Sequence, residues 1–191
     1  MKRTWVVVVV AVVILAAGYW WWQQRQAAGG GVAVDLVEAF RAAEKRTSLD
    51  PASAFSMEPQ TIGGVTRPAV FAHPPSRIIY HDVTVPEHGR LELFLAIKEE
   101  AWDKETDGVY FRVGVSHGEK YHELAARSLD PFRNPGDRGW VPLSFDLSQF
   151  AGEKVNVVFN THPSAPGGPN NGMYDFAVFG APRIVSANTA P

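Results

Sequence analysis

The 191-residue chain contains no cysteine. This excludes disulfides, thiolate metal ligands, a lipid-modified cysteine and a cysteine nucleophile. The chain also has no excess of positive charge, since 18 Lys and Arg residues against 20 Asp and Glu residues give a net charge of -2 and a pI near 6.3. Because nucleic-acid binding normally needs a basic face, the composition does not support a nucleic-acid partner.

Motifs for catalysis are missing as well. There is no Gly-x-Ser-x-Gly elbow, and no glycine-rich loop leads into a helix, so hydrolase and nucleotide-binding functions have no support. His122 and Glu123 resemble the start of a zinc-protease helix, but Ala126 stands where the second histidine is needed. The carboxylates between Asp103 and Asp107 fit a solvated loop. We therefore expect a protein that is not an enzyme.

A long uncharged run is present at the N-terminus, from Thr4 to Trp22, directly after Lys2 and Arg3. As a helix its 19 residues would span roughly 28 Å, close to the thickness of a bilayer core. It ends in tryptophans, which favour membrane interfaces. We expect a single-pass anchor in the bacterial cytoplasmic (inner) membrane, with the following domain on the periplasmic side. The alternative is a cleaved signal peptide with small residues at 16–18.

The rest of the chain divides by composition. Asp35 and Glu38 have the spacing of a capping box, which predicts the start of an amphipathic helix. That helix either covers one end of the following domain or docks against a partner. The predicted segments are the anchor, a flexible tether, the amphipathic helix, a β-sandwich and a tail: residues 1–22, 23–31, 32–50, 51–185 and 186–191.

Beyond the helix the pattern is that of strands. The stretch Trp140–Phe159 organises it, because two alternating runs flank a polar bend that ends at Gly152. The inward residues of these runs are Val141, Leu143, Phe145, Val155, Val157 and Phe159. About eight or nine strands of this kind, with no helix between them, predict a mainly β fold: an antiparallel jelly-roll β-sandwich.

Several framework motifs resemble one known family. They are Gly108–Val113 (GVYFRV), Trp140, Asp146–Ser148 with Gly152, and Tyr174–Ile184. Together they are similar to the galactose-binding-domain-like jelly roll, in the uncharacterised variety found in bacterial envelope proteins and related to discoidin-like and carbohydrate-binding modules. The resemblance covers Phe55 to Val185. It implies binding of a sugar, lipid or protein through loops at one end of the sandwich, and many members carry a structural calcium ion.

The candidate binding residues are loop aromatics. Trp102, Phe132 and Tyr174 lie next to predicted loops, where an aromatic ring can serve as a stacking platform for a ligand or partner. Each could instead anchor its loop. Trp140 begins a strongly alternating strand and is expected in the core.

The candidate metal ligands are Asp107, near the start of a strand, and Asp175, near the closing strand. Calcium takes several oxygen ligands from carboxylates and loop carbonyls, so the two residues could share an ion if their strand ends lie together. Ordinary turn capping is the alternative.

Two functions from different classes follow. The first is a non-catalytic accessory subunit, whose extracytoplasmic sandwich docks on and stabilises a larger membrane complex, such as a respiratory or photosynthetic one. Ala11 and Gly18 favour it, because they lie seven residues apart on one helix face and small residues permit close helix packing. The second is a membrane-tethered carbohydrate-binding module for envelope polysaccharide. The expected partners are therefore the bilayer, other membrane protein subunits, or glycan.

Overall fold

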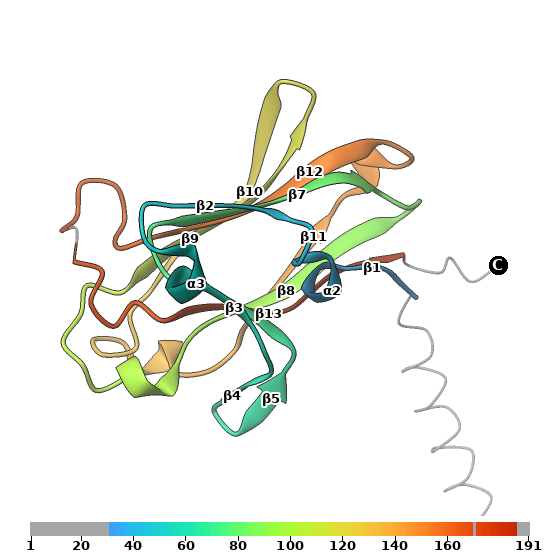
Figure 1. Cartoon of the computed structure of the whole chain (residues 1–191). Helices are drawn as coiled ribbons and strands as arrows, with labels where there is room; N and C mark the ends of the chain where they lie inside the picture. The colour runs from blue at the N-terminus through green and yellow to red at the C-terminus, as the bar shows by residue number, and fades with distance from the viewer. Residues whose placement is uncertain (1–30, 170, 187–191) are drawn as a thin grey trace, which may run out of the picture. The chain divides into compact units, whose positions relative to one another are not determined.

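The computed structural model describes residues 31–169 and 171–186, which form an antiparallel β-sandwich (Figure 1). The predicted anchor, nearly all of the tether and most of the tail lie outside these residues, so the structure does not test them. Within the described part of the chain, no helix has the length and apolar character needed to cross a membrane.

Two large sheets make up the sandwich. The six-stranded sheet contains, in spatial order, β11 (Val141–Asp146), β8 (Gly89–Ile97), β13 (Ala177–Ser186), β6 (Ala69–Ala72) and β3 (Phe55–Met57), with β1 (Val32–Asp35) also paired to β13. The five-stranded sheet contains β10 (Lys120–Leu129), β9 (Val109–His117), β12 (Lys154–His162), β7 (Ser76–Thr84) and β2 (Glu44–Thr47). All the strand pairs are antiparallel.

Smaller elements lie between the strands of the two large sheets. They are α2 (Leu36–Ala39), α3 (Pro51–Ala54), the hairpin of β4 (Gln60–Ile62) and β5 (Val65–Arg67), and the 3₁₀ turns η1 (Glu99–Ala101), η2 (Pro135–Asp137) and η3 (Ser148–Phe150). The hairpin turns at Gly63 and Gly64, which adopt the positive φ angles of 59° and 74° that a two-residue turn needs.

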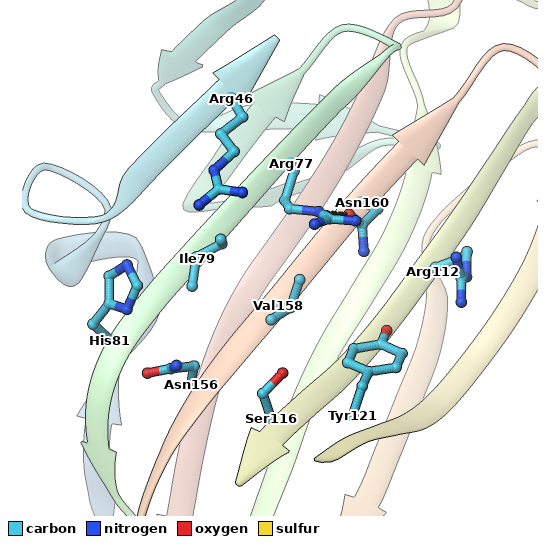
Figure 2. A pocket seen from close by; sticks show the side chains of 10 residues that line it. All are labelled: Arg46, Arg77, Ile79, His81, Arg112, Ser116, Tyr121, Asn156, Val158 and Asn160. Atoms are coloured by element: carbon cyan, nitrogen blue, oxygen red, sulfur yellow. Dashed lines mark hydrogen bonds between the residues drawn. The ribbon is translucent and has the colours of Figure 1, made fainter. Parts of the chain in front are cut away.

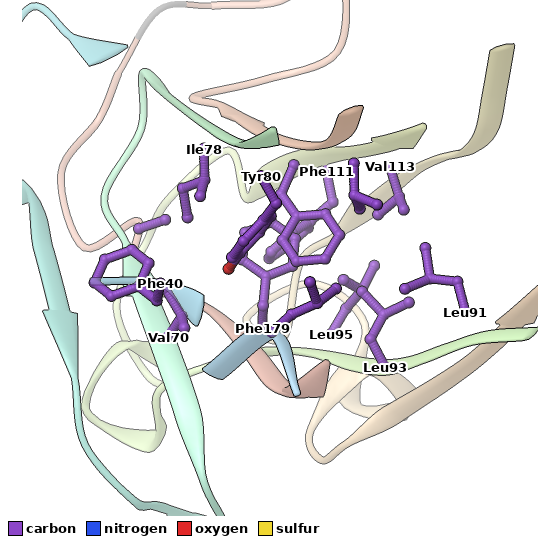
Figure 3. Close-up of a cluster of buried hydrophobic side chains, with 14 of the residues drawn as sticks. Phe40, Val70, Ile78, Tyr80, Leu91, Leu93, Leu95, Phe111, Val113 and Phe179 are labelled. Atoms are coloured by element: carbon purple, nitrogen blue, oxygen red, sulfur yellow. The ribbon is translucent and has the colours of Figure 1, made fainter. Parts of the chain in front are cut away.

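The core fills the space between the two large sheets (Figure 3). Alternate residues of each long strand point into it, as the period of two in the sequence predicts. Aromatic rings occupy its centre: Phe159 stacks on Phe179 with ring centroids 4.8 Å apart, and Phe111 meets Phe179 edge to face at 5.5 Å. All three side chains are fully buried, so the two sheets are held together mainly by apolar contact.

The stretch from 140 to 159 forms two strands, but they belong to different sheets. β11 pairs with β8, whereas β12 pairs with β7 and β9, so the bend between them carries the chain across the sandwich. Asp146 accepts hydrogen bonds from the amide and hydroxyl of Ser148, and Gly152 has a φ of 77°, as the bend requires. β11 is an edge strand, so its alternating residues are only half-buried.

The amphipathic helix predicted over 32–50 is wrong in its extent. The cap is present, because the Asp35 carboxylate accepts hydrogen bonds from the amides of Val37 and Glu38 at 2.8 and 3.2 Å. The helix α2 nevertheless ends at Ala39, and Glu44–Thr47 forms strand β2 at the edge of the five-stranded sheet. Backbone hydrogen bonding to β7 therefore overrides the helix propensity of the alanine, glutamate and lysine residues there.

A bulge interrupts the pairing of β7 with β12. The register shifts between Val155 and Val157, and Asp82 on the opposite strand has a φ of 53°. The side-chain amide of Asn156 accepts a hydrogen bond from the Asp82 backbone amide at 3.2 Å, which satisfies a donor that the irregular ladder leaves free. The bulge separates two outward residues, Ile79 and His81, from Val83, whose side chain belongs to the core.

Candidate functional site

A groove of about 420 Å³ lies on the outer face of the five-stranded sheet (Figure 2). It is formed by strands rather than by loops. Eight of the ten residues that line it are polar or cationic, and none has a carboxylate: Arg46, Arg77, Ile79, His81, Arg112, Ser116, Tyr121, Asn156, Val158 and Asn160.

Strand register arranges these side chains in rows across the sheet. In the first row Arg46 on β2 lies opposite Arg77 on β7, Arg77 lies opposite Asn160 on β12, and Asn160 lies opposite Arg112 on β9. Such neighbours have their Cβ atoms roughly 5 Å apart, so all four side chains can contact one bound molecule.

The second row gives the groove an apolar floor. Ile79 lies opposite Val158, and Val158 lies opposite Gly114. Gly114 leaves room for the ring of Tyr121, since a Cβ atom at this position would lie 2.4 Å from the tyrosine hydroxyl. The Tyr121 side chain therefore lies across β9 and remains 38% exposed. An exposed aromatic ring beside an apolar floor is a surface on which a flat or ring-shaped ligand can pack.

Two glutamates stand at opposite sides of the groove. Glu44 pairs with Arg46 and with His81, whose Nε2 lies 2.7 Å from its carboxylate, while Glu123 accepts from the Nε atom of Arg112 at 2.6 Å. These contacts lower the pKa of Glu44 and raise that of Arg112.

Arg77 is held differently. Its Nε atom donates to the Oδ1 atom of Asn160 at 2.6 Å, and among the described residues no carboxylate forms an ion pair with it.

The arginines of the groove also affect His162, which lies at one end of the groove. Burial lowers the pKa of His162, and the guanidinium groups of Arg112 and Arg77 lower it further, because they oppose a second positive charge nearby. Burial likewise raises the pKa of the Tyr121 phenol, which therefore stays neutral and can donate a hydrogen bond at physiological pH.

The loop aromatics predicted from the sequence lie at one end of the sandwich, away from the lining of the groove. Trp102 is half-buried, and its indole nitrogen donates to the carbonyl of Ile97 at 2.9 Å, so it anchors its own loop. Phe132 is 39% exposed. Tyr174 is half-buried, packs edge to face on Phe176 and lies below the ammonium group of Lys104.

Contacts between the loops show that this end is a single cluster. A terminal nitrogen of Arg138 donates to the carbonyl of Trp102 at 2.9 Å, and Arg133 from the loop of Phe132 donates to the carbonyl of Thr106. The structure thus brings the three loops together, and ligand binding by the three aromatics stays a prediction. The helix-packing residues Ala11 and Gly18 lie outside the described residues.

The two predicted metal ligands sit in the same loop cluster. The side chain of Asp175 is completely buried, with one oxygen accepting from the Thr106 hydroxyl at 3.0 Å and the other without a hydrogen-bond partner in the described structure. Both carboxylate oxygens of Asp107 are also buried without a described partner. Burial raises the pKa of Asp175 from 3.8 to about 7, and repulsion from Asp107 and Asp130 adds to the effect.

These residues fit calcium in chemistry but form an incomplete ligand set. Three carboxylate oxygens without partners are of the kind that calcium takes, yet calcium needs 6–8 oxygen ligands. Among the described residues no group of three His, Asp or Glu side chains is arranged to hold a metal. Backbone carbonyls and water would have to complete the shell. Calcium binding here stays a prediction.

The groove residues were missed by the sequence analysis, which searched the loops. Their signal in the sequence is weak but present. On the central strands β7, β9 and β12, the outward half of the alternation contains Arg77, Arg112, Asn156 and Asn160. Large hydrogen-bonding side chains at such positions, in the middle of a sheet, indicate a face that is open to a ligand.

Comparisons with known proteins give a fold and no function. No family model matches the chain. A protein of Archaeoglobus fulgidus, described only as uncharacterized, is 36% identical over 123 residues, which are 60% of this chain and 30% of that protein. The chain thus spans about a third of the length of this curated relative.

Several of the similar solved structures are carbohydrate-binding modules, which are galactose-binding-like β-sandwiches as the framework motifs predict. One is the CBM51 module of Clostridium perfringens GH95 in complex with methyl-galactose, with a TM-score of 0.45, 15% identity and coverage of 80% of this chain and 99% of the module. Another is CsCBM6-3 of Clostridium stercorarium with cellobiose, with a TM-score of 0.38, 10% identity and coverage of 78% and 95%. Because the TM-scores are below 0.5, we argue function from the groove itself.

Proposed function

We propose that the chain is a non-catalytic binding module whose outer-face groove holds a carbohydrate. The observation that carries the proposal is the lining of the groove, where guanidinium, amide and hydroxyl groups surround an apolar floor and an exposed tyrosine ring. A sugar presents hydroxyl groups at its edge and C–H groups on its faces. The groove offers a complement to both: hydrogen-bonding groups in the rows of Asn160 and Asn156, and apolar surface at Ile79 and Tyr121.

The groove is also suited to rigid recognition. Its central side chains stand on β7, β9 and β12, each of which is hydrogen-bonded on both sides. A site on interior strands loses little conformational freedom when a ligand binds, and this favours affinity for a weakly interacting molecule such as a sugar.

The proposal keeps the location predicted from the sequence, with residues 1–22 as a membrane anchor and the sandwich outside the cytoplasm. The function as an accessory subunit of a membrane complex depends on the same N-terminal segment, through Ala11 and Gly18. No feature of the described residues favours the accessory-subunit function over glycan binding. The experiment below therefore includes a result that would support it.

The test uses the full chain in a polyoxyethylene detergent, which has no sugar headgroup to compete. Binding to soluble envelope polysaccharides and to defined oligosaccharides is measured by affinity electrophoresis and calorimetry. We expect saturable binding that Tyr121→Ala weakens roughly tenfold, since an aromatic contact contributes about 1.4 kcal/mol. The matched controls are Trp102→Ala and Phe132→Ala, which remove aromatic rings from the loop cluster and should leave binding unchanged.

Two other results would contradict the proposal in different ways. Loss of binding in the loop variants alone would move the site to the loop cluster. The absence of binding to any glycan would overturn the proposed function. In that case, co-purification with other membrane proteins that is lost when residues 4–22 are exchanged for an unrelated span would support the accessory-subunit function instead.

A further inference from the structure

The first row of the groove has a charge pattern that the fold itself does not need. Arg46 and Arg77 are direct partners on adjacent strands, and Arg112 stands on the far side of Asn160 in the same row (Figure 2). Like charges directly opposite each other in an antiparallel pair destabilise it. A chain with a net charge of -2 nevertheless gathers three arginines on one row of one sheet face.

The glutamates near the row neutralise only part of this positive charge. Glu44 neutralises Arg46 and also contacts His81, and Glu123 neutralises Arg112. The central guanidinium, that of Arg77, has no acidic partner among the described residues. The groove therefore contains one full positive charge more than its protein partners balance.

The orientation of Arg77 makes this charge available to a ligand. The hydrogen bond from its Nε atom to Asn160 fixes the guanidinium along the row, and no described protein group accepts from its two terminal nitrogens. Those nitrogens form one edge of a planar fork, which matches the two oxygens of a carboxylate or a sulfate. Burial is the main reason that the pKa of His162 is lowered, and the guanidinium groups of Arg112 and Arg77 add to the effect.

We infer that the groove selects negatively charged saccharides, with the anionic group of one sugar residue bound to Arg77 and its ring packed on the floor beside Tyr121. The inference rests on the proposed carbohydrate function and specifies the class of sugar. A carboxylate, as in a uronic acid, and a sulfate ester are the two sources of the same chemistry. In the bound state the ligand supplies the counter-charge that the sheet face lacks.

The experiment compares ligands that differ only in charge. Titration calorimetry of the full chain in polyoxyethylene detergent uses trigalacturonic acid, its fully methyl-esterified form and a sulfated neutral trisaccharide, with galactose, N-acetylglucosamine and cellobiose as further neutral probes. We expect the acid to bind at least roughly tenfold more tightly than the ester, and the advantage to shrink as salt rises from 50 to 500 mM, on the order of a threefold fall in Debye length. The sulfated probe shows which anion provides the charge.

Substitutions show which residue provides the preference for the acidic probe. Arg77→Gln should remove the preference for the acidic probe, and Arg77→Lys should retain only part of it because the lysine lacks the planar fork. Arg90→Gln, which makes the same charge change at an exposed residue of the six-stranded sheet, is the matched control and should keep the preference. Arg77→Gln also removes the repulsion with Arg46, so its melting temperature should equal or exceed that of the wild type. A lower melting temperature would reveal a folding defect.

The outcomes separate the inference from the proposal on which it rests. Equal binding of the acid and its ester, or a preference that Arg77→Gln does not reduce, would overturn the inference while leaving carbohydrate binding in place. Binding to none of the probes, neutral or acidic, would overturn both. A preference that Arg90→Gln reduces as much as Arg77→Gln would show only general attraction to a polyanion and would also overturn the inference.

Discussion

The outer faces of the two sheets differ in how far other parts of the chain cover them. Part of the outer face of the six-stranded sheet is covered: Ala96 of β8 and Val178 of β13 are buried beneath the β4–β5 hairpin with Ile62 and the ring of Trp140. The outer face of the five-stranded sheet has no such cover and presents the row of Arg77 and its neighbours.

The covered face shows how close packing is achieved. Trp140 lies directly on Gly180, where a Cβ atom would come within 2.4 Å of the ring, and its indole nitrogen donates to the carbonyl of Val65 at 2.8 Å. Arg67 completes the cover by placing its guanidinium 3.5 Å from the centre of the Phe94 ring. On the open face, arginine and asparagine occupy the equivalent outward positions. One face therefore contributes to stability and the other is available for binding.

We expect the largest loss of stability from a substitution in the core, which both sheets share. Phe159→Ala removes a buried ring that contacts Phe179 and Tyr80, and should cost about 3–5 kcal/mol of unfolding free energy. Urea denaturation measures it. An unchanged midpoint would mean that Phe159 is exposed and that the register of β12 is different.

A smaller loss of stability should distinguish the covered face from the open face. Trp140→Ala uncovers the second apolar cluster and removes the hydrogen bond that holds the hairpin, and should cost about 2–4 kcal/mol. Tyr121→Ala on the open face is the matched aromatic deletion and should cost less than about 1 kcal/mol, because its ring is partly in water. Equal losses in the two variants would remove the distinction between a stabilising and a binding face.

The smallest effect concerns the loop cluster and depends on pH. The pKa of Asp175 is about 7 in the folded protein and 3.8 ordinarily, so its contribution to stability is fully present below about pH 4 and is lost as the pH rises through about 7. With chelator present, raising the pH from 5 to 8 should lower the melting temperature of the wild type by a few degrees more than that of Asp175→Asn.

Calcium provides the control for this measurement. A calcium site at Asp107 and Asp175 predicts that millimolar calcium restores the melting temperature of the wild type at pH 8 and has no effect on Asp175→Asn. If calcium acts equally on both proteins, the two carboxylates are not its ligands. If the pH dependence of the two proteins is the same without calcium, Asp175 is already ionised in the folded state.

Strands could be predicted from the sequence and the binding face could not, and the reason is physical. The alternation of Leu91, Leu93 and Leu95 is a local property, so β8 follows from it directly. The pairing of Arg46 with Arg77 joins residues 31 positions apart in the chain, and it depends on β2, a strand that local propensity assigns to a helix. Loop aromatics were the visible candidates, whereas outward residues in strands look like ordinary surface.

The loop cluster was predicted in part. The sequence predicts that Asp107 and Asp175 lie together if their strand ends meet, and the structure places both in the loop cluster, whereas the complete burial of Asp175 was not predicted. The strand itself begins later than its pattern suggests, at Ala177, and Tyr174 before it adopts a φ of 64°, which interrupts an extended conformation. The association of Trp102, Phe132 and Tyr174 in one cluster follows from the fold, but the anchoring role of Trp102 depends on a single hydrogen bond to Ile97 that no sequence pattern indicates.

The location of the first row on strands also governs how its specificity can change during evolution. On the interior strands the residues of the row alternate with core residues, as Arg77 does with Ile78 and Asn160 with Phe159. An insertion or deletion of one residue within these strands would exchange the groove with the core and unfold the protein. New ligands can therefore be acquired only by substitution at fixed outward positions, whereas the loop cluster can lengthen or shorten without that penalty. Variation among homologues should accordingly consist of exchanged side chains in the groove and of changes in length at the loops.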